Sequence, residues 1–188
     1  MKLGEIAEIQ SGLVLSRKRA ETEFETVKSY KIITLKSLVD GILNLDYIED
    51  FSSVEELSDK YITQKGDVLI RLSEPNTAIY INEILTGYLV PSNFSIIRLK
   101  TDNISPEFLA LYLNSRRVKR EMKISHIGST IRAIKKSFLS NLEIEEIPLE
   151  KQKIVTEIRR LHLKEKSLLK ELLEQKEKLY QGVINKVL

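Results

Sequence analysis

The chain has 188 residues, of which 42% are hydrophobic and 30% charged, which is enough for one globular domain of roughly 145 residues and an additional helix. It contains no cysteine and only two histidines, so disulfides, thiol catalysis and cysteine-based metal sites are excluded, and we expect no metal site. No apolar run approaches the roughly 18 residues that a membrane span needs, and we therefore expect a cytoplasmic protein without membrane contact.

The net charge of +3 is unevenly distributed along the chain. Between Glu21 and Pro75, 12 acidic residues outnumber 6 basic ones. Two other segments are basic, the triplet at 17–19 and the region 116–136, in which Glu121 is the one acid. Because phosphates are neutralised locally, such clusters indicate contact between a polyanion and selected loops, although a solvated helix face explains residues 116–123 equally well. The bases of the second region are Arg116, Arg117, Lys119, Arg120, Lys123, Arg132, Lys135 and Lys136.

The first predicted element is a short helix over residues 3–9, ended by the glycine of Ser11-Gly12. Short β-branched or alternating runs with turn-rich links follow, and they predict a mixed, strongly twisted sheet. The predicted strands are 30–35, 42–48, 67–72, 77–81, 88–90 and 94–99, with a last strand at 142–147. Between them, Ser105-Pro106 predicts a capped helix that extends into the basic region.

From Pro148 to Leu188 there is no further proline and no glycine before Gly182, while leucines and isoleucines recur every three or four residues. This pattern predicts a helix of about 55 to 60 Å, at about 1.5 Å per residue. An isolated helix cannot bury its apolar seam, so we expect pairing with a neighbouring helix as a coiled coil. The stripe is wider than one seam, which leaves a second face for a further subunit or for the chain's own domain. The predicted dimer-interface residues are Ile158, Leu161, Leu168, Leu172, Leu179 and Val183.

Four motifs follow one another in a particular order. They are residues 3–9 with Ser11-Gly12, the run Lys-Gly-Asp-Val-Leu-Ile at 65–70, the run Gly-Ser-Thr-Ile at 128–131, and residues 142–155, which pass into the long helix. Their order and spacing resemble one half of the specificity subunit of a type I restriction-modification system. The resemblance extends from Leu3 to the end of the chain and is to a half-size form, with a single target-recognition domain and one conserved helix.

This resemblance implies an α+β target-recognition domain at residues 1–147 and a dimerisation and spacer helix at residues 148–188. It implies a non-catalytic subunit without a cofactor, which binds double-stranded DNA and docks methyltransferase and restriction subunits. Two copies with antiparallel helices would form a homodimer that reads a bipartite, inverted-repeat target. Residues 70–76 lack the glycine that many members have there, which leaves a degenerate orphan specificity protein as an alternative.

Candidate DNA contacts come from three sets of loops. The segment after Gly128 combines backbone amides, hydroxyls and cations, a composition suited to gripping phosphates. Its candidate residues are Ser129, Thr130, Arg132, Lys135 and Lys136. A basic triplet can reach phosphates or guanines, unless it is only a solvated loop; it consists of Arg17, Lys18 and Arg19. Four polar residues can read base edges, although turn formation explains them equally well; they are Ser73, Asn76, Ser92 and Asn93.

Enzymatic interpretations find little support in the sequence. The run Glu121-Met122-Lys123 loosely matches the spacing of metal-dependent nucleases, but it falls on a predicted helix, where alternating charges are common. No glycine-rich phosphate loop and no methyltransferase motif is present. The alternative from another class is a coiled-coil adaptor that does not bind DNA and whose globular domain binds protein. Salt-dependent duplex binding would separate the two hypotheses.

Overall fold

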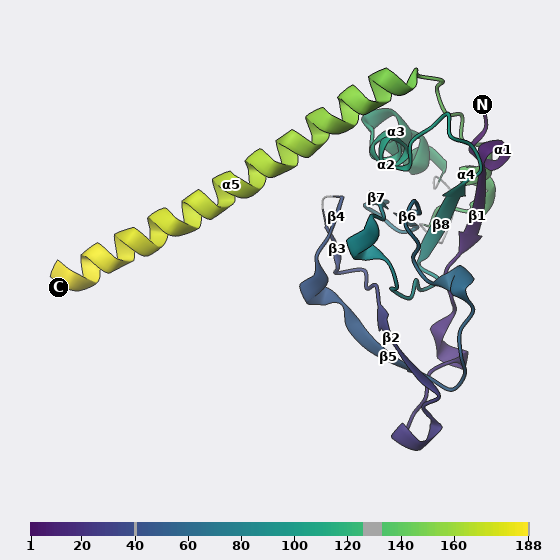
Figure 1. Ribbon diagram of the computed structural model, residues 1–188, viewed down its shortest axis with the longest axis horizontal. Helices are drawn as coiled ribbons and strands as arrows, with labels where there is room; N and C mark the ends of the chain where they lie inside the picture. Colours follow the sequence, from purple (N-terminus) through teal and green to yellow (C-terminus); the bar gives the residue numbers. More distant parts are fainter. Residues whose placement is uncertain (40, 126–132, 188) are drawn as a thin grey trace. The chain divides into compact units, whose positions relative to one another are not determined.

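The computed structural model describes residues 1–39, 41–125 and 133–187 of the chain. The chain divides into two compact units, Met1–Leu149 and Glu150–Leu188. The first unit contains the described strands and the shorter helices, and the second consists of the long C-terminal helix (Figure 1).

A four-stranded antiparallel sheet with the order β1-β8-β6-β7 lies at the centre of the first unit. Its strands are β1 (Ala7–Ser11), β8 (Phe94–Leu99), β6 (Val68–Arg71) and β7 (Ala78–Tyr80). In the register of β6 and β8, Val68 lies opposite Ile97 and Leu69 opposite Ile96. Side chains alternate between the faces of a strand, and all four of these are fully buried, so both faces of the sheet are covered. This explains why β6 and β8 read as continuous apolar runs.

Helices cover one face of the sheet. They are α1 (Leu3–Ile6), α2 (Pro106–Leu113), α3 (Arg116–Ser125) and α4 (Lys136–Asn141). Each contributes to one apolar cluster with Val68, Ile70 and Ile97 of the sheet. The predicted capping of α2 is confirmed, since the Ser105 hydroxyl accepts a hydrogen bond from the Phe108 amide at 3.1 Å.

The other face packs against the segment between β1 and β6. It contains the hairpin of β3 (Leu38–Val39) and β4 (Ile42–Leu43) and the antiparallel ribbon of β2 (Lys28–Ile32) and β5 (Glu49–Ser53). Leu38 and Leu43 pack on the sheet in a second cluster. Phe51 of the ribbon belongs to a third cluster, together with Ile32 and Leu89. The ribbon therefore lies far from α2 and α3 within this unit (Figure 1). Short 3-10 helices lie in this segment at Leu15–Arg17, Glu23–Glu25, Leu45–Tyr47 and Asp59–Tyr61, and a further one lies between β7 and β8 at Glu83–Leu85.

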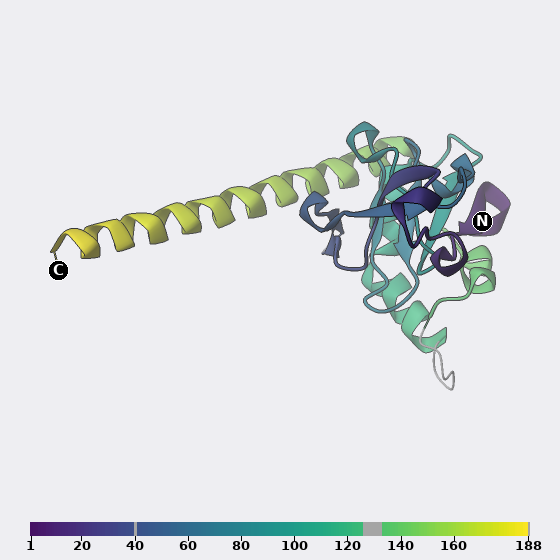
Figure 2. The same ribbon diagram turned by 90° about the horizontal axis from the view of Figure 1, so that it is seen from below.

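The second unit is a single unbroken helix, α5 (Leu149–Val187), in both views (Figures 1 and 2). Its 39 residues correspond to about 58 Å, as the sequence predicts. The six predicted interface residues are all exposed in the single chain, at 51–69% of their surface. Within the described ranges, no helix has the length and apolar character needed to cross a membrane.

The predicted α+β class is confirmed, but several predicted elements differ. Of residues 42–48, only Ile42–Leu43 form a strand, and Leu45–Tyr47 form a 3-10 helix. The helix predicted from Ser105-Pro106 into the basic region is divided into α2 and α3. Residues 7–9 form part of β1 instead of the first helix, because alternate residues from Ala7 are buried against β8. Residues 142–147 form no strand and pair only through the isolated bridge between Lys2 and Glu143. Residues 88–90 pair only through bridges of Leu89. Among the described residues, parallel pairing occurs at two isolated bridges, so the mixed character of the sheet is confined to them.

Candidate nucleic-acid interface

Three loops meet at the edge of the sheet where β1 and β6 end and β7 and β8 begin. We call this edge, made by residues 11–14, 71–77 and 91–95 together with residues 133–136, the loop end. Backbone hydrogen bonds join the loops: Ser92 donates to Leu13 at 2.8 Å, and Leu72 donates to Asn93 at 2.9 Å. Residues that are up to 80 positions apart in the sequence therefore form one surface.

Gly12 explains why the first and third loops can approach so closely. A Cβ atom at this position would lie 2.2 Å from the carbonyl oxygen of Pro91. Only glycine leaves room for this backbone contact. The Ser11-Gly12 motif thus sets the spacing of the loop end, although the sequence predicted only that it ends a helix.

The segment after residue 132 joins the same surface. Ser73 forms a bridge with Ala133, and the Ile134 amide donates to the Leu72 carbonyl at 2.9 Å. Lys135 and Lys136 follow directly and are exposed. The other candidates of this segment, Ser129, Thr130 and Arg132, lie outside the described residues.

Two polar atoms at the loop end have no hydrogen-bond partner. They are Oδ1 of Asn93 and Oγ of Ser95, both inaccessible to solvent. A buried acceptor without a donor costs about 1 to 3 kcal/mol, so a hydrogen bond from an ordered water, or from a ligand that displaces the covering atoms, would be stabilising there.

Arg71 is a residue at the loop end that the sequence did not single out. Its Nε donates to the Ser73 hydroxyl at 3.0 Å, and its Nη1 lies 3.5 Å from the Leu35 carbonyl. The guanidinium is thereby oriented, with further N–H groups left for another acceptor. The signal in the sequence is a single cation that directly follows the apolar run of β6.

Asn76, in contrast, does not face a ligand, and its assignment as a base reader is wrong in this structure. It is 4% exposed, and its amide nitrogen donates to the Leu72 carbonyl at 2.7 Å. Its φ of 50° lies in the left-handed region, which asparagine tolerates better than most residues. Asn76 therefore shapes the turn, which was the alternative explanation for the asparagines. Ser73 is partly exposed and Ser92 is exposed.

The basic triplet lies beside the β2–β5 ribbon, and two of its three side chains already contact other residues of the chain. Lys18 pairs with Glu55 at 2.7 Å, and the Arg19 guanidinium lies 5.2 Å from the centre of the Phe51 ring. The exposed Arg17 is the member best placed to meet an anion. The triplet thus contributes less available charge than the sequence indicates.

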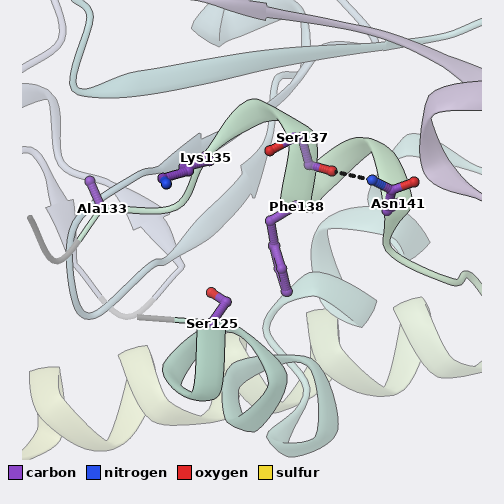
Figure 3. A pocket seen from close by; sticks show the side chains of 6 residues that line it. All are labelled: Ser125, Ala133, Lys135, Ser137, Phe138 and Asn141. Atoms are coloured by element: carbon purple, nitrogen blue, oxygen red, sulfur yellow. Dashed lines mark hydrogen bonds between the residues drawn. The ribbon is translucent and has the colours of Figure 1, made fainter. Parts of the chain in front are cut away.

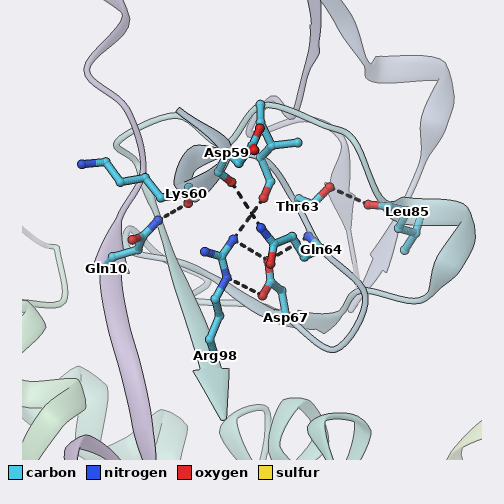
Figure 4. Close-up of polar contacts among 9 residues, drawn as sticks. Gln10, Asp59, Lys60, Thr63, Gln64, Asp67, Leu85 and Arg98 are labelled. Atoms are coloured by element: carbon cyan, nitrogen blue, oxygen red, sulfur yellow. Dashed lines mark hydrogen bonds and ion pairs between the residues drawn. The ribbon is translucent and has the colours of Figure 1, made fainter. Parts of the chain in front are cut away.

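At the opposite edge of the sheet, polar groups satisfy one another. We call this edge, where β6 begins and β8 ends, the closed end. Arg98 donates to Asp67 twice, at 2.9 and 3.2 Å, and also to the Ile62 carbonyl at 3.1 Å (Figure 4). The Gln64 amide donates to the same carboxylate at 2.9 Å. The aspartate of the motif at 65–70 is therefore a structural residue, with 3% of its side chain exposed.

A cavity of about 330 Å³ lies between the end of α3 and the start of α4. Figure 3 shows Phe138 pointing from α4 towards Ser125 of α3, with Lys135 at the start of α4. Four of the six residues that line it are polar, and the Asn141 side chain donates to the Ser137 carbonyl at 2.9 Å. In the part of the chain that the structure describes, no group of three histidine, aspartate or glutamate side chains is arranged to hold a metal ion.

The chain belongs to the family of type I restriction modification DNA specificity domains, whose model matches residues 1–177. Specificity subunits of this family are not themselves catalytic. The family predicted from the motifs is thereby confirmed. A comparison with curated proteins gave no match.

Solved structures of type I systems share the fold. The HsdS subunit from Thermoanaerobacter tengcongensis matches with a TM-score of 0.67 and 16% identity, over 92% of this chain and 43% of that one. The S subunit from M. genitalium matches with a TM-score of 0.56 and 14% identity, over 93% and 41%. A chain from a structure of type I R-M complex assembly and conformational transition matches with a TM-score of 0.61 and 19% identity, over 91% and 39%. The chain thus spans about two fifths of the length of these proteins.

Proposed function

We propose that this chain reads one half of a bipartite DNA sequence for a type I restriction-modification system, through the loop end of its first unit. The family match over residues 1–177 carries the proposal. The loop end supports it, because Arg71, Ser73, Asn93 and Lys135 come from distant parts of the sequence and lie on joined segments. Such side chains can contact phosphates and base edges.

We further propose that two copies pair through α5 with antiparallel helices. The support is the row of exposed apolar side chains at three- and four-residue spacing, since leaving such a row in water is unfavourable. A twofold pair would present two identical loop ends, and its target would then be an inverted repeat with a gap.

The same helix offers a surface for methyltransferase and restriction subunits. Leu169, Leu173 and Tyr180 are 60%, 69% and 59% exposed and flank the seam. One helix partner covers one stripe, so a second apolar stripe fits a further protein. Docking of the catalytic subunits on this second stripe is therefore part of the proposal.

Selection of bound duplexes from a random DNA pool tests DNA reading directly. The purified chain is used alone and together with a type I methyltransferase subunit. Recovery of a gapped inverted repeat is the expected result and would support both reading and twofold assembly. Recovery of no preferred sequence by the folded protein, with the methyltransferase subunit present, would favour the adaptor or a degenerate member.

Substitution of the seam tests the pairing separately. The double variant Leu168→Lys, Leu172→Lys places charges at the centre of the seam, and a folded monomer is expected in sedimentation equilibrium. The control is Ser167→Lys, which adds charge beside the seam and should leave the dimer intact. A dimer that persists in the double variant would refute this interface.

A further inference from the structure

Helix α3 carries a row of cations that the loop end does not include. Lys119 and Arg120 lie three and four positions after Arg116, and Lys123 lies four and three positions after them. Residues at this spacing are neighbours on the surface of a helix. Arg116, Arg120 and Lys123 are exposed, and we call these three residues the α3 stripe.

The acidic residue of this helix does not neutralise the stripe. Glu121 pairs with Arg117 at 3.2 Å, and Arg117 also lies 3.8 Å from Glu145. At about 100° per residue, Glu121 and Arg117 lie on the flank of α3 that faces away from Lys119 and Lys123. Within the described ranges, no acidic side chain pairs with a residue of the α3 stripe.

Two side chains attach α3 to the loop end. Lys119 donates from Nζ to the carbonyl oxygens of Pro75 and Asn76, at 2.5 and 2.7 Å. Just before the helix, the Asn114 side chain accepts from the Ala78 amide at 3.0 Å and donates to the Ala78 carbonyl at 2.6 Å. Asn114 therefore continues the backbone pairing of the edge strand β7.

These contacts place the stripe beside the turn at residues 73–76. The ammonium of Lys119 donates to the two carbonyls, so Lys119 acts as a positioning residue that holds α3 beside the turn. Its neighbours in the helix, Arg116 and Lys123, lie next to it and remain exposed. The turn beside the stripe carries the exposed Glu74, whereas the acid of α3, Glu121, lies on the flank that faces away from Lys119 and Lys123.

We propose that the α3 stripe binds the phosphate backbone of DNA next to the bases that the loop end reads, an inference that rests on the proposed function. From Arg116 to Lys123 the helix rises about 10 Å. Along the axis of a DNA duplex, the phosphates of one strand are spaced about 3.4 Å apart. The stripe therefore matches about three phosphates. Contacts of this kind fix the register of a protein on the duplex without reading its sequence.

The test measures how duplex affinity depends on salt for the full-length chain and a random-sequence DNA duplex. The logarithm of the affinity decreases linearly with the logarithm of the salt concentration. In the triple variant R116Q/R120Q/K123Q this decrease should be shallower, its slope smaller in magnitude by about 2 to 3, because each phosphate contact contributes about 0.9. At about 200 mM salt this corresponds to an affinity about tenfold weaker or more. Glutamine is a good helix former, so the variant should stay folded, as far-UV circular dichroism can verify.

The matched control is the triple variant K28Q/K31Q/K65Q, which changes the net charge equally. Lys28, Lys31 and Lys65 pair with acids away from α3, and their removal should leave the slope nearly unchanged. The single variant R117Q controls for the loss of a cation of α3 that does not belong to the stripe. The α3 variant should still select the same DNA sequence as the wild type, since backbone contacts carry no sequence information.

The outcomes separate this inference from the proposed function. If the wild type shows no salt-dependent duplex binding, the proposed function fails. If the wild type binds with a steep slope and R116Q/R120Q/K123Q keeps that slope, only the role of the α3 stripe is overturned. An equal loss in both triple variants would also overturn it, because charge in general and not this stripe would then account for the binding.

Discussion

The two ends of the four-stranded sheet are both polar, but they differ in whether their polar groups have partners. At the closed end, Asp67 and Arg98 satisfy each other and the surrounding backbone. At the loop end, Asn93 and Ser95 each leave an acceptor without a donor, and Arg71 keeps N–H groups available. A network whose hydrogen bonds are all made stabilises the fold, whereas an unpaired polar group contributes a hydrogen bond only when a ligand or water binds to it. Stability should therefore depend on the closed end and DNA affinity on the loop end.

The largest effect is expected at the closed end. Asp67→Ala should destabilise the first unit by about 3 kcal/mol, because Arg98 and the Gln64 amide lose a buried acceptor. A quarter of the Arg98 side chain is exposed, so the cost should be near the lower limit for a broken buried pair. Urea unfolding monitored by circular dichroism measures the change.

Lys65→Ala is the control from the same motif. Its ammonium pairs with Glu83 at the surface, where both side chains are more than 60% exposed, so the loss of stability should be far smaller than for Asp67→Ala. Equal losses in the Asp67 and Lys65 variants would show that the aspartate is no more structural than its neighbour. The distinction between the two ends would then be wrong.

A second substitution disrupts the loop end through its backbone. Gly12→Ala places a Cβ atom 2.2 Å from the Pro91 carbonyl oxygen and 2.5 Å from that of Val90. The loops must separate, and we expect a destabilisation of about 1 to 3 kcal/mol together with weaker duplex binding. The control is Gly182→Ala, which has no heavy atom within 4 Å and should stabilise its helix by up to about 1 kcal/mol. A Gly12 variant with wild-type stability and affinity would contradict the close approach of the loops.

A third substitution tests whether the unpaired groups serve binding. Asn93→Ala removes a buried acceptor that has no partner, so stability should change by less than about 1 kcal/mol. Affinity for the selected duplex should fall by about 1 to 3 kcal/mol if the amide reads a base. Fluorescence anisotropy with a labelled duplex measures the loss.

The matched asparagine is Asn82, which follows β7 towards the closed end. Its side chain accepts from the Leu85 amide at 3.2 Å, so Asn82→Ala should cost about 0.5 to 1 kcal/mol in stability and leave affinity unchanged. If the Asn93 variant loses stability and keeps its affinity, Asn93 is a structural residue like Asn82.

Sequence reasoning succeeded where the signal is local. The spacing of leucines predicts α5, Ser105-Pro106 predicts the start of α2, and apolar runs predict β6 and β8. It failed for residues 7–9, because helical spacing and strand alternation both fit Ala7 and Ile9, and only pairing with β8 decides between them.

The candidate site could be predicted only in part, because its geometry depends on distant residues. The candidates Ser73, Asn93 and Lys135 were named from composition, but their meeting at one edge depends on pairings such as Ser73 with Ala133. The buried state of Asn76 likewise depends on a turn conformation that composition leaves open. No local pattern shows that Lys119 is anchored and Arg120 is free, since the two are adjacent in the sequence.

A pH-dependent effect is predicted for Lys119, whose Nζ donates to two backbone carbonyls of the loop end. Burial lowers the pKa of Lys119 from its ordinary 10.5 to about 8. Between about pH 8 and pH 10.5 the unfolded chain binds more protons at Lys119 than the folded chain does. This residue therefore makes the free energy of unfolding rise with pH across this range. The urea midpoint of the wild type relative to Lys119→Met should therefore increase between about pH 7 and about pH 9.5. Lys123→Met, on the same helix but exposed, serves as the control substitution. A difference between wild type and Lys119→Met that is independent of pH would mean that Lys119 is not buried beside the loop end in solution, because burial is the cause of the lowered pKa.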